Sequence, residues 1–307
     1  MYIKEQLWSF NTRDLMRASS CEHCTKIAVA RTLGIASVLE RLKPYEDALE
    51  EARLAGEDQS LAQKYGVLFE NALVEELLAS VPGGIVVKPE KEGDKQQTIQ
   101  LMEAGVPIIY QGGLQRVFGK TVFNGRPDFL VHENWEISFT AGKLSARQIS
   151  FQTESNTYAA FDAKYGGSAK PAYLLQLALY VDALEELGYK SEVTKHGLVL
   201  GSRTVETYEE IEMVPAMRLA REKIISLIDL TEDPGYLATL DSAHIQWHCP
   251  SKTSCDICEY PDLCSDDRKI TDDLVQVSGI TQLQIGKLAT VGITTMRQLS
   301  EADPANR

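Results

Sequence analysis

The sequence lacks any long hydrophobic run. A stretch of about eighteen apolar residues, the length that a membrane-spanning helix needs, occurs nowhere in its 307 residues. The opening residues MYIKEQLWSFNTRDLM contain no apolar segment of the kind that forms a signal peptide. Internal repeats and low-complexity tracts are also missing. We therefore expect a soluble, cytoplasmic, globular protein.

Positive charge is also in short supply. The chain has 31 Lys and Arg residues against 44 Asp and Glu residues, which gives a formal net charge of −13 at pH 7. Because proteins bind phosphate through Lys and Arg, this balance argues against a broadly basic surface for nucleic acid, and leaves room for a local basic groove. With 44% hydrophobic residues the chain can bury a sizeable core, and we expect one large domain with a small appendage.

Helical patterns open the chain, and strand-like segments follow them. Apolar residues at spacings of three and four predict helices within 11–55, over 61–81, over 171–189 and within 206–230. Alternating, β-rich runs predict strands within 84–89, 106–114, 120–132, 135–139, 152–166 and 195–202. The polar stretch 88–97 is interpreted as a solvated loop. Helices before and after a mixed sheet indicate an α/β or α+β fold.

Two carboxylates lie in the strand-like segments GRPDFLV and FDAKYGG. Because side chains alternate along a strand, Asp162 and Lys164 project from one face and Ala163 from the other. If Asp128 lies on the neighbouring strand, its carboxylate can meet that of Asp162 and hold a hard divalent cation such as Mg²⁺. Taken alone, an Asp-x-Lys triplet is more often a surface salt bridge.

A third acid comes from the helix predicted over 61–81. In GVLFENALVEELL, Glu70 falls at helical offsets that share one apolar stripe with Val67, Val74 and Leu78. We therefore expect Glu70 to face the core, where a carboxylate needs a partner. A cation shared with the two aspartates would supply that partner, and a capping or solvent-reaching side chain is the simpler alternative.

Gln176 and Tyr180 lie one turn apart on the later helix and could reach the same centre. The order Glu, Asp, Asp-x-Lys, Gln-x3-Tyr is more specific than any of its members, and it resembles the PD-(D/E)xK nucleases of the RecB type. GRPDFL and FDAKYGG match the two core motifs of that family, and LLQLALY matches its helical Gln-x3-Tyr motif.

The resemblance implies a restriction-endonuclease-like mixed sheet flanked by helices, together with metal-dependent hydrolysis of phosphodiester bonds. It implies a catalytic set of Glu70, Asp128, Asp162, Lys164, Gln176 and Tyr180, with Mg²⁺ or Mn²⁺ held by Glu70, Asp128, Asp162 and the carbonyl of Ala163. Lys164 would orient or activate the attacking water. Between Asp128 and Asp162 lie 33 residues, more than in the usual family hairpin, and this insert predicts an extended hairpin.

The six cysteines fall in two short windows, which hold Cys21 and Cys24, and then Cys249, Cys255, Cys258 and Cys264. In a reducing cytosol such clusters indicate a metal site rather than disulfides. The spacing Cys-x2-Cys-x5-Cys in TSCDICEYPDLC supplies three ligands, so the fourth must come from elsewhere. His23 and His248 are near enough in sequence to ligate zinc.

Iron–sulfur nucleases of the RecB-like group, such as the AddB nuclease domain and CRISPR-associated exonucleases, carry one cysteine before the nuclease core and three after it. Their pattern implies a cluster, 4Fe–4S in type, held by Cys21, Cys255, Cys258 and Cys264. The alternative is a zinc site of Cys21, Cys24, Cys255 and Cys258, which leaves Cys264 spare. Thiolates suit both groups, and Cys249 is interpreted as a bystander.

The tail over 269–307 contains two short helical patterns, each preceded by an apolar turn with glycine, VSGI and VGI. It is similar to a helix-hairpin-helix module that presents backbone N–H groups to DNA phosphate, with a plain helical hairpin as the alternative. We thus expect a nuclease domain over 1–268 and this tail. Related bacterial proteins often carry a helicase domain further on, so the chain is expected to be a fragment or a stand-alone nuclease.

These patterns together predict a metal-dependent DNA nuclease, a single-strand exonuclease in type, acting in DNA repair, recombination or end processing. Its partners would be single-stranded DNA and a helicase domain or protein. The alternative is a non-catalytic, metal-stapled module that binds DNA or another protein. A broken set of acids would favour that alternative, and here the set is intact.

Overall fold

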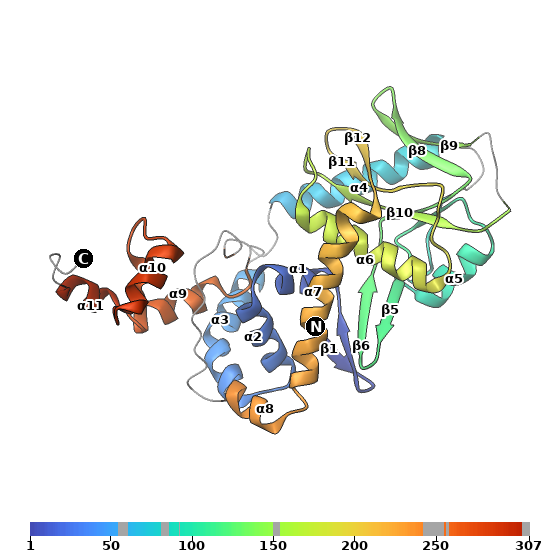
Figure 1. Cartoon of the computed structure of the whole chain (residues 1–307). Coiled ribbons are helices and arrows are strands. Elements are labelled where there is room, and N and C mark those ends of the chain that lie inside the picture. The colour runs from blue at the N-terminus through green and yellow to red at the C-terminus, as the bar shows by residue number, and fades with distance from the viewer. Residues whose placement is uncertain are drawn as a thin grey trace. The chain divides into compact units, whose positions relative to one another are not determined.

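The computed structural model describes residues 1–54, 61–80, 86–91, 93–149, 154–241, 255 and 258–302. The chain forms two compact units (Figure 1). The first unit consists of Met1–Ser19 and Gly56–Ser226, and the second of Ser20–Ala55 and Leu227–Arg307. The predicted boundary at residue 268 therefore lies inside the second unit. Among the described residues, no helix has the length and apolar character required to cross a membrane.

A six-stranded mixed sheet forms the centre of the first unit. Its strand order is β12 (Thr204–Tyr208), β11 (His196–Leu200), β10 (Tyr158–Lys164), β7 (Phe129–His132), β4 (Ile108–Tyr110) and β3 (Val86–Val87). Strand β10 pairs in parallel with β11 and antiparallel with β7, where Phe161 lies opposite Phe129. Asp162 and Asp128 are the residues next to this last pair, just beyond the end of the paired register. The mixed α/β architecture expected from the sequence is confirmed.

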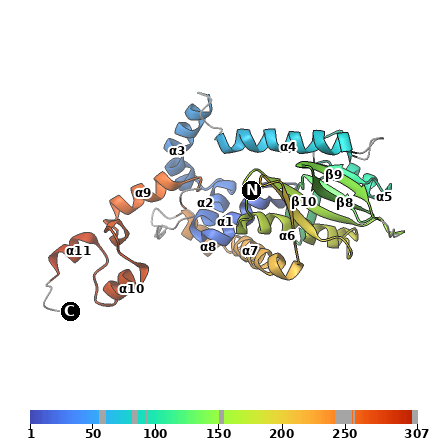
Figure 2. The same ribbon diagram turned by 90° about the horizontal axis from the view of Figure 1, so that it is seen from above.

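Two helices cover the two faces of this sheet (Figure 2). Helix α4 (Leu61–Ser80) lies on one face, and its buried Phe69, Leu73 and Leu77 pack with Phe129 and Phe161 of the strands. Helix α6 (Pro171–Leu187) lies on the other face and is buried along most of its length. It begins at a proline in its first turn and ends at Gly188, whose φ of 76° terminates the helix.

A second sheet and a separate hairpin complete the strands of the first unit. The four-stranded sheet has the order β1 (Tyr2–Lys4), β2 (Leu7–Phe10), β6 (Thr121–Gly125) and β5 (Leu114–Phe118). Strands β8 (Trp135–Thr140) and β9 (Lys143–Gln148) pair antiparallel within the insert between Asp128 and Asp162. The predicted extended hairpin is thus present, and it leaves β7 and β10 as direct neighbours.

Several predicted elements differ in extent from those observed. The region 11–55 forms three helices, α1 (Thr12–Ser20), α2 (Glu22–Thr32) and α3 (Ala36–Leu54), with Gly34 at φ 73° between the last two. The predicted loop 88–97 is too long, because α5 (Lys95–Glu103) begins within it. The Asp94 carboxylate caps α5 by accepting a hydrogen bond from the Gln97 N–H at 2.9 Å. Strands β1, β2, β5 and β12 were not predicted, because they are short or only partly buried, and β9 was predicted only as part of the extended hairpin.

The second unit is helical in its described part. Helix α7 (Glu210–Leu230) runs into it from the first unit, and α8 (Pro234–Asp241), α9 (Pro261–Ile270) and the 3₁₀ turn η2 (Leu274–Gln276) follow. Ile27, Val38, Leu42 and Leu263 form its core together with Cys24. The two short helices expected in the tail are α10 (Gln282–Thr290) and α11 (Met296–Glu301), each opened by a Thr–Gln capping box.

Candidate functional site

Two aspartates meet where β7 begins and β10 ends. Asp162 is the fifth residue of β10 and is only 1% exposed, whereas Asp128 precedes β7 and is partly exposed. The N–H of Ala163 donates a hydrogen bond to Asp128 Oδ2 at 2.6 Å, which ties the carboxylate to the neighbouring strand. The structure therefore places Asp128, Asp162 and the backbone of Ala163 together, in the arrangement that strand alternation predicts.

Burial and neighbouring acids disfavour the ionised forms of the two aspartates. Burial raises the pKa of Asp128 well above its usual value, and the nearby charges of Asp162 and Glu70 raise it further. Burial also raises the pKa of Asp162, while the Lys164 ammonium acts in the opposite direction without cancelling the effect. Glu70 belongs to the same electrostatic group because it raises the pKa of both aspartates. The group thus carries more negative charge than its surroundings neutralise.

Lys164 is the cation of this group. Its Nζ forms an ion pair with Asp162 Oδ2, and the side chain is 20% exposed. Burial alone lowers the pKa of Lys164, but the carboxylates of Asp162 and Asp128 outweigh that effect and raise it. The ammonium also lies 5.3 Å from the centre of the Tyr173 ring. Lys164 therefore stays protonated at neutral pH and offers N–H donors beside the acids.

Gln176 and Tyr180 reach Asp162 from α6, as their spacing of one turn predicts. Gln176 Nε2 and the Tyr180 hydroxyl lie 3.2 Å and 3.4 Å from Asp162 Oδ1, and Gln176 Nε2 lies 2.5 Å from the Tyr180 oxygen. Gly125 makes room for this ring, since a Cβ added there would lie 2.6 Å from Tyr180 Cδ1. Oδ1 of Asp162 is therefore fixed by two donors, and Oδ2 is left to the ion pair with Lys164.

Glu70 reaches the site from α4, but not along the predicted stripe. Val67 and Leu78 are 58% and 51% exposed, because the buried face of the helix carries Phe69, Leu73 and Leu77 instead. The prediction that Glu70 shares a core-facing stripe with Val67 and Leu78 is therefore wrong. Glu70 lies at the border of the buried face, where its carboxylate is partly exposed.

Two residues at the end of β4 hold the Glu70 carboxylate. Its Oε1 accepts hydrogen bonds from the Tyr110 hydroxyl at 2.8 Å and from Gln111 Nε2 at 2.6 Å. Gln111 has a φ of 54°, and its N–H donates to the backbone carbonyl of Asp128 at 3.0 Å. Sequence reasoning missed Gln111, because a single polar residue after a short strand carries no periodic signal. Gln111 therefore links the third acid to the chain segment that carries Asp128.

The acidic group has the chemistry of a site for a hard divalent cation. Oδ2 of Asp162 is buried, and among the described residues its partner is the Lys164 ammonium. Its neighbours are further carboxylate oxygens, the ligands that Mg²⁺ and Mn²⁺ prefer, and Mg²⁺ typically uses one or two carboxylates and keeps several waters. A cation between Asp128 and Asp162 would offset the burial and the neighbouring negative charge that raise their pKa values. The residues present fit the cation.

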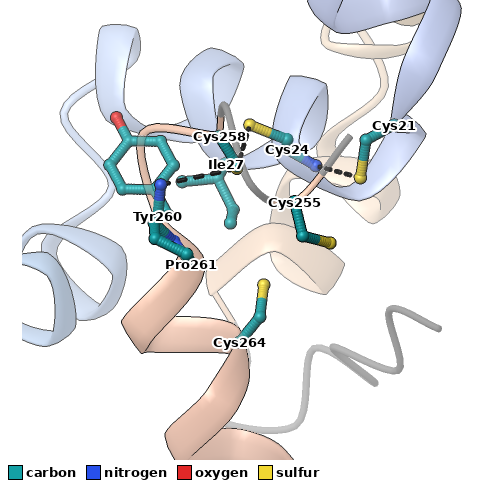
Figure 3. Close-up of a pocket in the computed structure, with 8 residues that line it drawn as sticks. All are labelled: Cys21, Cys24, Ile27, Cys255, Cys258, Tyr260, Pro261 and Cys264. Carbon is teal, nitrogen blue, oxygen red and sulfur yellow. Dashed lines mark hydrogen bonds between the residues drawn. The ribbon is translucent and has the colours of Figure 1, made fainter. Parts of the chain in front are cut away.

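Five cysteines line one pocket of the second unit. Figure 3 shows Cys21 and Cys24 of α2 facing Cys255, Cys258 and Cys264. Cys24 and Cys264 are buried, with 5% and 6% exposure, and the other three are partly buried. Ile27, Tyr260 and Pro261 complete the lining. The structure thus assembles the described cysteines from segments more than two hundred residues apart in the sequence.

Helix ends and backbone donors surround the thiols. Cys21 is the N-cap of α2 and its Sγ accepts from the Cys24 N–H at 3.4 Å, while the Tyr260 N–H donates to Cys258 Sγ at 3.4 Å. Cys264 lies in the first turn of α9. Because the N-terminal end of a helix is electropositive, these positions favour the thiolate form that metals require. The thiols fit a soft metal group.

Both predicted ligand sets are present around this pocket. Cys24 and Cys258 have their sulfur atoms 3.5 Å apart, close to the spacing of about 3.8 Å that a tetrahedral zinc ion with Zn–S bonds of about 2.3 Å would impose. Cys264 lines the same pocket, as the iron–sulfur set requires. Burial lowers the pKa of His23 to about 4, so this imidazole is neutral at pH 7. Cys249 and His248 lie outside the described residues.

Neither site is arranged in advance around a single ion. Across the residues that the structure describes, no three His, Cys, Asp or Glu side chains surround one point in the manner of a metal site. At the acidic site two carboxylates with waters are sufficient for Mg²⁺, whereas four thiolates must converge at the cysteine pocket. A metal at the pocket would therefore require the cysteine side chains to move.

Comparison of the chain with models of protein families and with curated proteins finds no match.

Proposed function

We propose that this chain is a metal-dependent nuclease that hydrolyses phosphodiester bonds in single-stranded DNA, of the RecB-like PD-(D/E)xK kind and with a restriction-endonuclease-like fold. One observation carries the proposal. Asp128 and Asp162 lie at the adjoining ends of β7 and β10, where the Ala163 N–H donates to Asp128 Oδ2, and both have raised pKa values beside the Lys164 cation. Acids arranged in this way are costly to the fold unless a cation joins them.

Asp128 and Asp162 would hold Mg²⁺ or Mn²⁺ with the carbonyl of Ala163. Glu70 adds negative charge from α4 and is kept in place by Tyr110 and Gln111. When bound, the cation would polarise the phosphate and lower the pKa of the attacking water. Gln176 and Tyr180 fix Asp162 Oδ1, so that this aspartate presents Oδ2 in one orientation.

Lys164 donates hydrogen bonds from an ammonium that remains charged at neutral pH. These N–H groups would orient the attacking water and stabilise the negative charge that develops on the phosphate oxygens. Because Lys164 stays protonated, it acts as a donor and not as the base. The carboxylates are the groups next to it that can accept a proton from the water.

The cysteine pocket would hold a 4Fe–4S cluster through Cys21, Cys255, Cys258 and Cys264, with zinc on Cys21, Cys24, Cys255 and Cys258 as the alternative. Either group would join α2 to the segment that precedes and includes α9, within the second unit. We assign this metal a structural task because all the described cysteines lie in the second unit, whereas the acids lie in the first.

The tail is proposed to act as a helix-hairpin-helix that contacts DNA phosphate. Support comes from Gly279 and Gly292, which have φ of 76° and 79° and precede α10 and α11. A chain with this tail would work in the cytoplasm on DNA ends, alone or with a helicase. Repair, recombination and end processing are the processes that need such an activity.

The test is a cleavage assay on single strands labelled at the 5′ or the 3′ end, with Mg²⁺, with Mn²⁺ and with a chelator. We expect cleavage that requires the cation, and the two labels report the polarity. A closed circular strand tests whether an end is needed. A purified, folded protein that cuts none of these substrates with either metal would refute the proposed activity and would favour the non-catalytic binding module.

A further inference from the structure

Two tyrosines form an exposed stack beside the acidic group. The rings of Tyr65 and Tyr165 have their centres 5.6 Å apart and are inclined by only 14°. Tyr65 is 49% exposed and Tyr165 is 52% exposed. Exposed aromatic rings that stack on each other keep a large apolar face in water, and burial in the core therefore does not explain them.

The stack has a rigid support. The ring of buried Phe69, one helical turn after Tyr65 on α4, meets Tyr165 edge-on with ring centres 6.0 Å apart. The backbone of Tyr165 is fixed from the other side by Gly201, where an added Cβ would lie 1.9 Å from the Tyr165 carbonyl oxygen. The two rings are thus held in place before any ligand arrives, which reduces the entropy lost on binding.

The stack adjoins the proposed cleavage site along two elements. Tyr165 follows Lys164 directly at the end of β10. Tyr65 lies five residues before Glu70 on α4, a rise of about 7.5 Å along the helix axis. The Arg203 guanidinium lies 5.6 Å from the centre of the Phe69 ring and is ion-paired with Glu76 at 2.8 Å, and Lys164 is ion-paired with Asp162. The stack is therefore joined to the strand and the helix that carry the proposed cleavage site.

We propose that the Tyr65–Tyr165 stack is a platform on which a base of a single-stranded DNA substrate stacks, next to the phosphate that is cut. This assignment rests on the proposed nuclease function and adds its substrate contact. Aromatic stacking binds unpaired bases with little regard to sequence and is blocked in an intact duplex, where both faces of each base are covered. A docked protein helix is the other occupant to consider, because Leu61 and Leu68 of α4 are also exposed. The position of Tyr165 directly after Lys164 of the proposed cleavage site favours a nucleic-acid strand as the occupant.

The experiment measures binding separately from cleavage. Single strands of DNA carrying one 2-aminopurine are titrated with protein in the presence of Ca²⁺ and without Mg²⁺, because the fluorescence of this base falls when it stacks. Tyr65→Ala and Tyr165→Ala are compared with Tyr65→Phe and Tyr165→Phe, which keep the aromatic faces. Tyr2→Ala is the control, since Tyr2 is a similarly exposed tyrosine, at 56%, in the other sheet of the same unit. A parallel titration with RNA distinguishes the two kinds of strand.

We expect each alanine variant to bind the DNA strand about tenfold more weakly and to lose the quenching, with KM for cleavage rising by a similar factor. The phenylalanine variants and Tyr2→Ala should match the parent. Alanine variants that bind and quench as the parent does, while the parent cleaves, would overturn the stacking proposal alone. A parent that neither binds nor cuts any strand would overturn both proposals. Altered self-association of the alanine variants with unchanged DNA binding would assign the surface to protein contacts instead.

Discussion

The acidic site and the cysteine pocket are built in opposite ways. Asp128 and Asp162 are placed by the register of two adjacent strands, and the sheet that positions them has a hydrophobic core of its own. The cysteines come from two segments that lie far apart in sequence. Cys24 is itself part of the hydrophobic core of the second unit. We therefore expect the acids to lower the stability of the cation-free first unit, whereas a metal on the thiols would stabilise the second unit.

The largest effect is expected from Asp162→Ala, which should lower the rate of cleavage on the order of a thousandfold or more, because it removes a proposed cation ligand. The fold should remain, since the sheet does not depend on this carboxylate. Cleavage rates and thermal unfolding of the same preparation check both parts. Glu186→Gln is a control that neutralises an exposed acid on α6. A variant that cuts at the parent rate would contradict the assignment of Asp162.

At the cysteine pocket we expect substitutions to affect stability more than cleavage. Loss of a true ligand should lower the free energy of unfolding of the second unit by about 3 kcal/mol or more, because the binding energy of a structural metal is largely folding energy. Cys264→Ser and Cys24→Ser are prepared without oxygen and analysed for iron, sulfide, zinc and thermal unfolding, with Cys249→Ser as the control.

The two metal assignments differ in this cysteine experiment. With an iron–sulfur cluster, the parent is brown and loses its iron in Cys264→Ser but keeps it in Cys24→Ser. With zinc, the parent is colourless and only Cys24→Ser loses the ion. A parent that contains neither iron nor zinc, together with stable variants at both positions, would contradict a metal site at the cysteine pocket.

Asp128→Asn should stabilise the cation-free protein at pH 8, by on the order of 1 kcal/mol, because it removes a charge that the site penalises. The raised pKa of Asp128 means that the folded state binds its proton more tightly than the unfolded state. The protonated Asp128 therefore contributes its whole stabilising effect below the unfolded pKa of about 3.9. That effect is lost as the pH rises through the folded pKa.

The stability gained by Asp128→Asn should accordingly shrink at pH 4, and also on addition of Mg²⁺ at pH 8. Asp182→Asn provides the matched contrast, because Asp182 Oδ2 is paired with Arg221 Nη1 at 2.6 Å in a buried site. It should destabilise the protein at pH 8. Urea unfolding at both pH values measures the free energy of unfolding of each variant. Equal destabilisation by the two substitutions would contradict the claim that the charge of Asp128 destabilises the cation-free fold.

The smallest effect is expected from Gln111→Ala. It removes one of the two hydrogen bonds that hold Glu70 Oε1, while the Tyr110 hydroxyl remains. We expect kcat to fall by roughly fivefold with little change in KM, because one neutral-to-charged hydrogen bond contributes about 1–2 kcal/mol. Steady-state kinetics check this, and Tyr110→Phe should behave similarly. A rise in KM alone would indicate a role in binding the strand.

The sequence was most informative where the spacing within one strand or helix also determines which side chains meet in the fold. Alternation along β10 correctly placed Asp162 and Lys164 on one face, and the turn spacing of Gln176 and Tyr180 correctly aimed both at the same carboxylate. The stripe assigned to Glu70 failed because the rotation of α4 is set by its contact with the sheet, which selects Phe69, Leu73 and Leu77. The helix sequence alone offers several apolar stripes of similar quality.

Other features lie beyond any local pattern. The support of Glu70 by Gln111 and the stack of Tyr65 on Tyr165 both join residues from separate elements, and neither pair has a spacing that could reveal it. The sequence left two cysteine ligand sets open, and only the fold shows that the members of both sets line one pocket. Such contacts depend on which elements become neighbours.

The claim that Asp128 and Asp162 share a divalent cation is tested most directly by counting bound Mn²⁺. Electron paramagnetic resonance of the oxygen-free protein at pH 7.5 measures free Mn²⁺ during a titration, for the parent and for the variant that combines Asp128→Asn with Asp162→Asn. We expect the parent to bind at least one Mn²⁺, which Mg²⁺ displaces. We expect the variant to bind none at this site while it retains its fold. Equal Mn²⁺ binding by the two folded proteins would contradict it.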